Sequence, residues 1–94
     1  MVMRIVFTRR ANERLTEVAD YLYRQHCSKK FVVNYIRGFR DHLKRVLIQF
    51  PESGTLVPEY GEDIRRIICK EYSFLYQIRG NDIEILTVFR ENLA

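Results

Sequence analysis

The sequence predicts an α+β fold in which an antiparallel helical hairpin packs on a small, mainly antiparallel sheet. Two observations predict it: apolar residues recur at helical spacing through most of the first half, and they alternate along short segments of the last third. The predicted order is strand, helix, helix, strand, strand, strand. Without a linker or an internal repeat, residues 1–94 are expected to form one domain.

The first half contains a short strand and two helices. Residues 1–7 are expected to form the strand, and Thr8 and Ser28 are suitable N-caps for the two helices. The first apolar stripe, in a helix over residues 9–24, consists of Ala11, Leu15, Val18, Ala19 and Leu22. The second stripe consists of Val32, Ile36, Phe39, Leu43, Val46, Leu47 and Phe50. Pro51 ends the second helix. Gly38 costs this helix about 1 kcal/mol relative to Ala, so we expect the two helices to pack closely there.

The last third contains three short segments rich in β-branched and aromatic residues. They span residues 64–69, 74–79 and 83–90. Because successive side chains alternate across a strand, Phe74, Tyr76 and Ile78 are expected on one face. The pair Gly80-Asn81 tolerates positive φ, so the last two strands are predicted to form an antiparallel hairpin. Residues 51–62 are acidic and contain Pro and Gly, which predicts an irregular surface loop between helix and sheet. One face of the sheet is then expected to remain open.

The charge is distributed unevenly along the chain. The net charge is +4, but residues 4–45 carry eleven basic and four acidic side chains, whereas residues 46–94 carry five basic and eight acidic ones. The helical half therefore has a net charge of +7 and the remainder −3. A basic surface attracts nucleic acid or an acidic protein segment. A solvated helical surface is the alternative interpretation.

Several classes of protein are disfavoured by the sequence. No apolar run approaches the roughly 20 residues that cross a bilayer, so no membrane contact is expected. Cys27 and Cys69 have no C-x-x-C partner and no export signal precedes them, which predicts free thiols and a cytoplasmic location. His26 and His42 lie far apart and no Cys/His cluster has ligand spacing, so neither metal nor cofactor is expected. No glycine-rich phosphate loop, H-E-x-x-H, EF-hand loop or G-x-S-x-G is present.

The arginines of the predicted sheet are the remaining candidates for chemistry. Cleavage of RNA without a metal needs a base near the 2′-OH, cations around the phosphate and an acid at the leaving oxygen. For a nuclease the candidate residues are Arg65, Arg66, Lys70, Tyr76 and Arg90. Arginine stabilises a phosphate, but its high pKa makes it a poor proton carrier. The alternative is that Tyr76 belongs to the core and that Arg65 and Arg66 pair with loop acids such as Glu59 and Glu62.

The chain resembles the RelE/ParE family, the toxins of bacterial type II toxin–antitoxin modules. The resemblance spans nearly all 94 residues and depends on six short sequence fragments. Each fragment alone is weak evidence for the family, but their order and spacing together are fairly specific. The fragments are Ala11-Asn12-Glu13-Arg14-Leu15, Phe50-Pro51-x-x-Gly54, Val57-Pro58-Glu59, Ile64-Arg65, Tyr72-x-x-Leu75-Tyr76-x-Ile78 and Ile83-x-Ile85-Leu86-x-Val88. The resemblance implies a cytoplasmic, growth-inhibiting toxin that a co-expressed antitoxin neutralises by wrapping its C-terminal segment over it.

The family divides by mechanism, and this sequence departs from the nuclease pattern. RelE-like members cut mRNA on the ribosome, whereas ParE-like members poison DNA gyrase without being nucleases. Arg90 stands where related chains often have histidine, and Ser73 follows Tyr72 where arginine is frequent. We therefore favour a ParE-like, non-catalytic action on gyrase. A ribosome-dependent mRNA endonuclease and an inactive, antitoxin-binding relative are the two alternatives.

The basic side chains of the helices and the sheet are expected to make the contacts with target and antitoxin. The candidate binding residues are Arg9, Arg10, Arg14, Arg37, Arg40, Arg65, Arg66, Arg79 and Arg90. The expected partners are an acidic antitoxin protein, in a toxin–antitoxin hetero-oligomer, and either DNA gyrase or the ribosome with its mRNA. An acidic amphipathic segment of the antitoxin is expected to lie against the basic hairpin or alongside the sheet.

Overall fold

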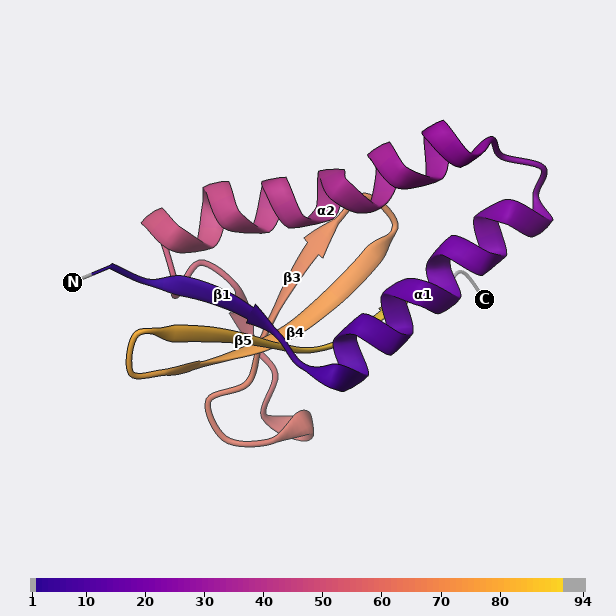
Figure 1. Cartoon of the computed structure of the whole chain (residues 1–94). Coiled ribbons are helices and arrows are strands. Elements are labelled where there is room, and N and C mark those ends of the chain that lie inside the picture. The colour runs from indigo at the N-terminus through magenta and orange to yellow at the C-terminus, as the bar shows by residue number, and fades with distance from the viewer. Residues whose placement is uncertain (1, 91–94) are drawn as a thin grey trace.

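The fold is a layer of two helices on one five-stranded sheet (Figure 1), seen in a computed structural model that describes residues 2–90. The elements are β1 (Arg4–Phe7), α1 (Arg9–Arg24), α2 (Lys29–Gln49), β2 (Thr55–Leu56), the 3-10 turn η1 (Pro58–Tyr60), β3 (Arg65–Cys69), β4 (Tyr72–Arg79) and β5 (Asp82–Arg90). The predicted α+β class and the predicted order of the main elements are confirmed. The structure adds β2, a strand of two residues, within the segment predicted to be irregular.

Both predicted N-caps are confirmed. The Thr8 Oγ1 accepts a hydrogen bond from the Ala11 backbone N–H at 3.2 Å, and the Ser28 Oγ accepts one from Phe31 N–H at 3.1 Å. Each satisfies a backbone donor that a helix start leaves unpaired. Thr8 Oγ1 also donates to the Ile85 carbonyl at 2.9 Å. The cap of α1 therefore also attaches this helix to β5.

The sheet has the strand order β1-β5-β4-β3-β2. β1 is parallel to β5, and the other three pairings are antiparallel. The predicted hairpin of β4 and β5 is confirmed, with Arg79 opposite Asp82 and a two-residue turn between them. Gly80 takes a φ of +58° at the first position of that turn, where a side chain would be strained. β1 and β2 are therefore the two edges of the sheet.

A bulge in β5 changes which side chains face the helices. Leu75 pairs with Thr87 but Tyr76 pairs with Ile85, so Leu86 is an extra residue. Ile85 and Val88 consequently both belong to the main core although three positions separate them. Leu86 packs with the smaller cluster on the other face. Strict alternation thus describes β4 and fails in β5.

The main core lies between the helices and the sheet. Its fully buried large side chains include Phe39, Leu43, Leu47, Phe74, Tyr76, Ile83, Ile85 and Val88. Phe74, Tyr76 and Ile78 all pack into this core, as their alternation predicts. Phe50, which was assigned to the stripe of the second helix, is 64% exposed, because it is the C-cap and its backbone has left the helical conformation, with φ −132° and ψ 74°.

The second sheet face is partly covered, so the prediction of an open face is wrong there. Val57 and Ile64, which flank η1, are buried against Leu75 of β4. The segment predicted to be an irregular surface loop therefore pairs through β2, buries Val57 and closes over the sheet. The acidic side chains of this segment are exposed to solvent, whereas its buried apolar side chains pack on the sheet and hold the segment there.

Gly38 of α2 lies beside the end of a lysine side chain from the sheet layer. A Cβ at this position would lie 2.9 Å from Lys70 Nζ, at the turn between β3 and β4. The same ammonium group lies 3.9 Å from the centre of the Tyr35 ring and 5.1 Å from that of Phe39. The expectation that Gly38 marks close packing of the two helices is therefore wrong: Lys70 occupies the space.

Candidate functional site

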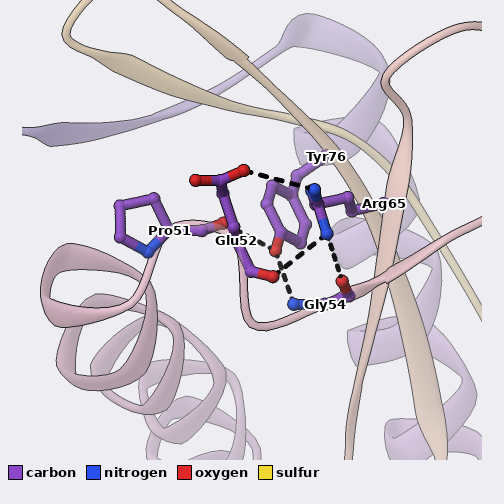
Figure 2. A network of polar contacts seen from close by, with 5 residues as sticks. All are labelled: Pro51, Glu52, Gly54, Arg65 and Tyr76. Carbon is purple, nitrogen blue, oxygen red and sulfur yellow. Dashed lines mark hydrogen bonds and ion pairs between the residues drawn. The ribbon is translucent and has the colours of Figure 1, made fainter.

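The structure places Tyr76 in a buried corner where α2 connects to the sheet (Figure 2). Its side chain is 0% exposed. The Tyr76 hydroxyl donates to the Pro51 carbonyl at 2.8 Å and accepts from the Gly54 backbone N–H at 2.9 Å. Burial raises the pKa of this hydroxyl above its ordinary value, since the phenolate would be poorly solvated there. The hydroxyl therefore serves as an internal brace between the loop and the sheet.

Arg65 lies in the same corner and is bonded to the same loop. Its Nη1 donates to the carbonyls of Glu52 and Gly54 at 3.0 and 2.8 Å, and its Nη2 lies 3.4 Å from Glu52 Oε1. Only 20% of the side chain is exposed. The expectation that Arg65 pairs with an acidic residue of the loop is confirmed. The partner is Glu52, and not Glu59 or Glu62, which were given as examples.

Gly54 allows this corner to close. A Cβ on Gly54 would lie 2.6 Å from the Tyr76 hydroxyl oxygen and 2.8 Å from the Arg66 carbonyl oxygen. No side chain fits between the loop and β4 at such distances. The Phe50-Pro51-x-x-Gly54 fragment therefore encodes a close approach of backbone to sheet, with Tyr76 and Arg65 bonded across it.

Arg90 lies at the other end of the sheet, beside α1. Its Nη1 donates to the Tyr21 hydroxyl at 3.1 Å, and its Nη2 lies 3.5 Å from Glu71 Oε2. The hydrogen bond to Tyr21 is the main cause of a raised pKa of the guanidinium. Arg90 therefore stays charged, which suits it to hold an anion and not to transfer a proton.

A cleft of about 190 Å³ opens next to Arg90, between α1 and β5. Arg14 lies on its wall, where Nε donates to the Val88 carbonyl at 3.0 Å and Nη1 pairs with Glu17 at 3.2 Å. Tyr72 also lines the cleft, and burial raises the pKa of its hydroxyl. Arg14 and Arg90 each have a nearby carboxylate, so the charge of this cleft is largely balanced.

The residues proposed for a nuclease lie at three separate places on the sheet. Arg65 pairs with Tyr76 across β3 and β4, whereas Arg90 pairs with Tyr72 across β4 and β5. Four residues of an extended strand separate these positions, or about 13 Å. Lys70 lies at the Tyr72 end, in the turn before β4. Arg66 stands opposite Leu75, on the face of the smaller cluster.

The predicted binding arginines are spread over several surfaces. Arg9 pairs with Glu13 at 3.7 Å and Arg79 with Glu84 at 3.7 Å, and both arginines are largely exposed. Arg10 is exposed at the start of α1. Arg37 and Arg40 line a hollow between the helices. The nine arginines therefore do not form one patch.

Sequence reasoning missed the residues that surround the arginines. Tyr21 and Glu71 contact Arg90, and Lys44 follows Arg40 by one turn of α2. Spacings of four along the helix, from Arg40 through Lys44 to Ile48, could have indicated a shared surface. No sequence signal placed Tyr21 beside Arg90, because that contact depends on how α1 crosses β5.

Three further observations concern ligands and surroundings. Cys27 and Cys69 are both free thiols, as predicted. Within residues 2–90, no three His, Cys, Asp or Glu side chains are grouped as a metal ion would require. Across that same range, neither helix combines the length and the hydropathy that a membrane span needs.

Comparison with known proteins agrees with this architecture. No curated protein matches the sequence significantly. A solved structure described as a chromosomal ParDE toxin–antitoxin system from P. aeruginosa is similar in fold, with a TM-score of 0.78 and 20% sequence identity over 97% of this chain and 98% of the other. The family model of the ParE toxin of the type II toxin–antitoxin system parDE matches residues 5–92. The chain therefore belongs to the ParE family of type II toxins.

Proposed function

We propose that this ParE-family toxin inhibits growth by binding DNA gyrase, without catalysing RNA cleavage. One observation carries the proposal: the Tyr76 hydroxyl is buried and bonded on both sides, to the Pro51 carbonyl and the Gly54 N–H. A proton carrier must reach its substrate. The nearby Arg65 donates to two loop carbonyls, so this corner supports the fold.

The proposal includes a protein partner and a location. The similar structure is described as a ParDE toxin–antitoxin system. By analogy, an antitoxin binds this chain in a toxin–antitoxin hetero-oligomer and neutralises it in the cytoplasm. The net charge of +4 favours an acidic antitoxin.

Induction of the protein in growing cells tests the proposed target. Incorporation of ³H-thymidine should fall before that of ³⁵S-methionine, and the SOS response should be induced. With purified gyrase and supercoiled plasmid, the protein should produce linear DNA. Early loss of protein synthesis with mRNA cut at codons would instead establish a nuclease. Normal growth would show that the chain is inactive.

Arg90→Ala separates the two mechanisms further. Within residues 2–90, the Arg90 guanidinium bonds to the Tyr21 hydroxyl and pairs with the exposed Glu71, and neither partner is a core residue, so the substitution should leave the fold intact. A phosphate clamp would lose about 1.5–3 kcal/mol with this charge, which is roughly tenfold to a hundredfold in RNA cleavage. Arg79→Ala, at the other end of the sheet, is the matched control. We expect no RNA cleavage from the wild type or from either variant.

A further inference from the structure

Helix α2 carries six basic side chains, and none of them pairs with a carboxylate among residues 2–90. All six are exposed to solvent. They are Lys29, Lys30, Arg37, Arg40, Lys44 and Arg45. Asp41 is the one acidic residue among the 21 residues of the helix, so six basic and one acidic side chain give α2 a net charge of +5.

Three of these cations form a row along the solvent side of α2, which we call the basic row: Lys30, Arg37 and Lys44. Residues seven apart turn by only about 20° around a helix axis, so the three side chains lie nearly in line. At 1.5 Å per residue the row is about 21 Å long. The buried residues Val32 and Phe39 lie on the other side of the helix, and Figure 1 shows α2 above the sheet, so the row faces away from the sheet.

The positive surface continues from the basic row to the edge of the sheet. Arg40 and Lys44 border a groove of about 310 Å³ between α2 and β1, together with Arg4, which pairs with Asp82. Among residues 2–90 no acidic side chain lines this groove. Arg40 donates to the neutral Asn12 Oδ1 at 3.2 Å. Arg40 and Lys44 therefore extend the charge of α2 to one flank of the row.

An anion that binds the cations of α2 displaces no acidic side chain. In the cleft between α1 and β5, by contrast, Arg14 pairs with Glu17 at 3.2 Å and Arg90 lies 3.5 Å from Glu71. A phosphate in that cleft would compete with carboxylates already in contact. At α2 only water and counterions leave, and the release of counterions drives the binding of basic surfaces to nucleic acid. The basic row is therefore the better site for a polyanion.

The charges of α2 do not stabilise the helix itself. Lys29 and Lys30 lie in its first turn, where the helix dipole favours acidic side chains, and that turn contains none. Arg37 and Asp41 have the i, i+4 spacing of a stabilising ion pair, yet they do not pair. A partner outside the helix accounts for both observations.

The composition of the basic row fits duplex DNA better than the other polyanions. Interfaces between proteins have an apolar core in which lysine is depleted, whereas Val33 is the one exposed large apolar side chain on the row side of α2, which the structure describes in full. Single-stranded nucleic acid is bound by stacking on aromatic side chains. Phe31, the exposed aromatic residue of α2, lies about 100° around the helix from Lys30 and stacks on Tyr35. A duplex needs a straight line of cations, since it carries one phosphate charge per about 1.7 Å of its axis.

We propose that the basic row of α2 binds the phosphate backbone of duplex DNA, independently of base sequence. Lys30, Arg37 and Lys44 contact phosphates along the duplex, and Arg40 and Arg45 add positive charge on the two sides of the row. The biological role rests on the proposed function, because a toxin that binds gyrase meets the DNA that gyrase holds. The binding itself needs no gyrase and is measured with toxin and DNA alone.

The salt dependence of binding to a labelled duplex of about 24 base pairs tests the proposal, with fluorescence anisotropy as the measurement. The logarithm of the affinity should fall with the logarithm of the salt concentration with a slope of about −3 to −4, and equally for two unrelated sequences. Lys30→Gln and Arg37→Gln should each lower the steepness by about one and weaken binding at low salt by about threefold or more. Arg79→Gln removes the same charge from the end of β4 and should leave the slope unchanged. Equal losses in all three variants would reduce the effect to net charge and overturn the proposal.

Removal of the one acidic side chain of α2 should strengthen binding, which a loss of folding cannot imitate. Asp41 lines a hollow of α2 with Lys44 and Arg45, so Asp41→Asn should raise the affinity for the duplex by about twofold or more. Glu59→Gln makes the same change of charge in η1, on the other side of the sheet from α2, and should leave the affinity unchanged. An equal gain in both variants, or no gain in Asp41→Asn, would count against the basic row.

Two other polyanions serve as competitors of the labelled duplex. Polyglutamate and a single-stranded oligonucleotide, each of the same total charge as the duplex, should both bind more weakly than the duplex. Tighter binding of polyglutamate would assign the row to an acidic protein segment. Tighter binding of the oligonucleotide would assign it to single-stranded nucleic acid. Either result would overturn the proposal.

The two proposals can fail separately. If the wild-type toxin binds the duplex through the basic row but leaves purified gyrase unaffected, the gyrase target is wrong and the assignment of the row holds. If gyrase is poisoned while the toxin alone does not bind the duplex, the assignment of the row is wrong and the gyrase target holds.

Discussion

The two edges of the sheet use arginine in opposite ways. At the β2 edge, Arg65 is mostly buried and donates to the carbonyls of Glu52 and Gly54. At the β1 edge, Arg40 is exposed and contacts a neutral amide and an aromatic ring. The first edge is closed by its own loop, and the second is left open beside a basic groove. The groups that surround an arginine therefore decide whether it stabilises the fold or is available to a partner. The residue type alone does not.

The largest effect is expected from Gly54→Ala at the closed edge. A Cβ there would lie 2.6 Å from the Tyr76 hydroxyl and 2.8 Å from the Arg66 carbonyl oxygen, so loop or strand must move. We expect the free energy of unfolding to fall by about 3 kcal/mol. Urea denaturation of the variant and of Thr55→Ala, an exposed neighbour, measures it. Equal stability of the two variants would mean that the corner tolerates expansion.

Replacing one arginine from each edge compares the edges directly. Arg65→Ala should lower the free energy of unfolding by about 2 kcal/mol, because two carbonyls lose a charged donor. Arg40→Ala should lower it by less than about 1 kcal/mol, because it loses an exposed cation–π contact and one hydrogen bond. Thermal unfolding of both variants ranks them. The reverse order would refute the distinction between the edges.

Tyr76→Phe tests the buried brace and its dependence on pH. The loss of the hydroxyl leaves Gly54 N–H and the Pro51 carbonyl without that partner, at a cost of about 1.5 kcal/mol at neutral pH. Burial raises the pKa of Tyr76 in the folded state above the ordinary value of 10.0. Its contribution is therefore fully present below pH 10 and is lost as the pH rises through the folded-state pKa.

The wild type should consequently lose stability above about pH 10 more steeply than Tyr76→Phe. Burial also raises the pKa of Tyr35 and Tyr72, so part of the alkaline loss should remain in the variant. Denaturation midpoints at a series of pH values provide the comparison, with Tyr60→Phe as the control for an exposed tyrosine. Parallel curves for wild type and Tyr76→Phe would count against this role.

The smallest effect is expected from Lys70, whose partners are aromatic. Its ammonium lies 3.9 Å from the centre of the Tyr35 ring. Lys70→Met keeps the apolar stem and removes the charge, so stability should fall by about 0.5–1 kcal/mol. Lys44→Met, in the open groove, makes the same change without an aromatic partner and should be neutral. A comparable loss in Lys44→Met would show that the groove cations do contribute to the fold.

Much of the fold was predictable, because it depends on local periodicity. The caps at Thr8 and Ser28, the stripe of α1 and the hairpin turn at Gly80 all follow from neighbouring residues. The covered second face was not predictable, because Val57 and Ile64 are isolated apolar residues in an acidic segment. The bulge at Leu86 was likewise not predicted, because the adjacent apolar pair Ile85-Leu86 is equally compatible with a regular strand that is covered on both faces.

The site was predicted less well than the fold. The sequence identified Arg65 and Tyr76 as notable residues, and it left open whether they form a site or a core. The structure bonds them to Pro51, Glu52 and Gly54. Arg90 and Lys70 lie near the other end of β4, each among tyrosines. Lys44 was not among the candidates, although its position one helical turn after Arg40 could have placed both side chains on one surface.

The sequence alone determined the element order, the free cysteines and the excess of positive charge in the helical half, because each follows from composition and short-range pattern. Only the tertiary structure decided which cations are bonded internally and which face a groove. That outcome depends on which carbonyls and carboxylates the packing of distant segments brings within about 3–4 Å of a guanidinium. Arg65 meets the loop after α2, and Arg40 meets the open edge of β1.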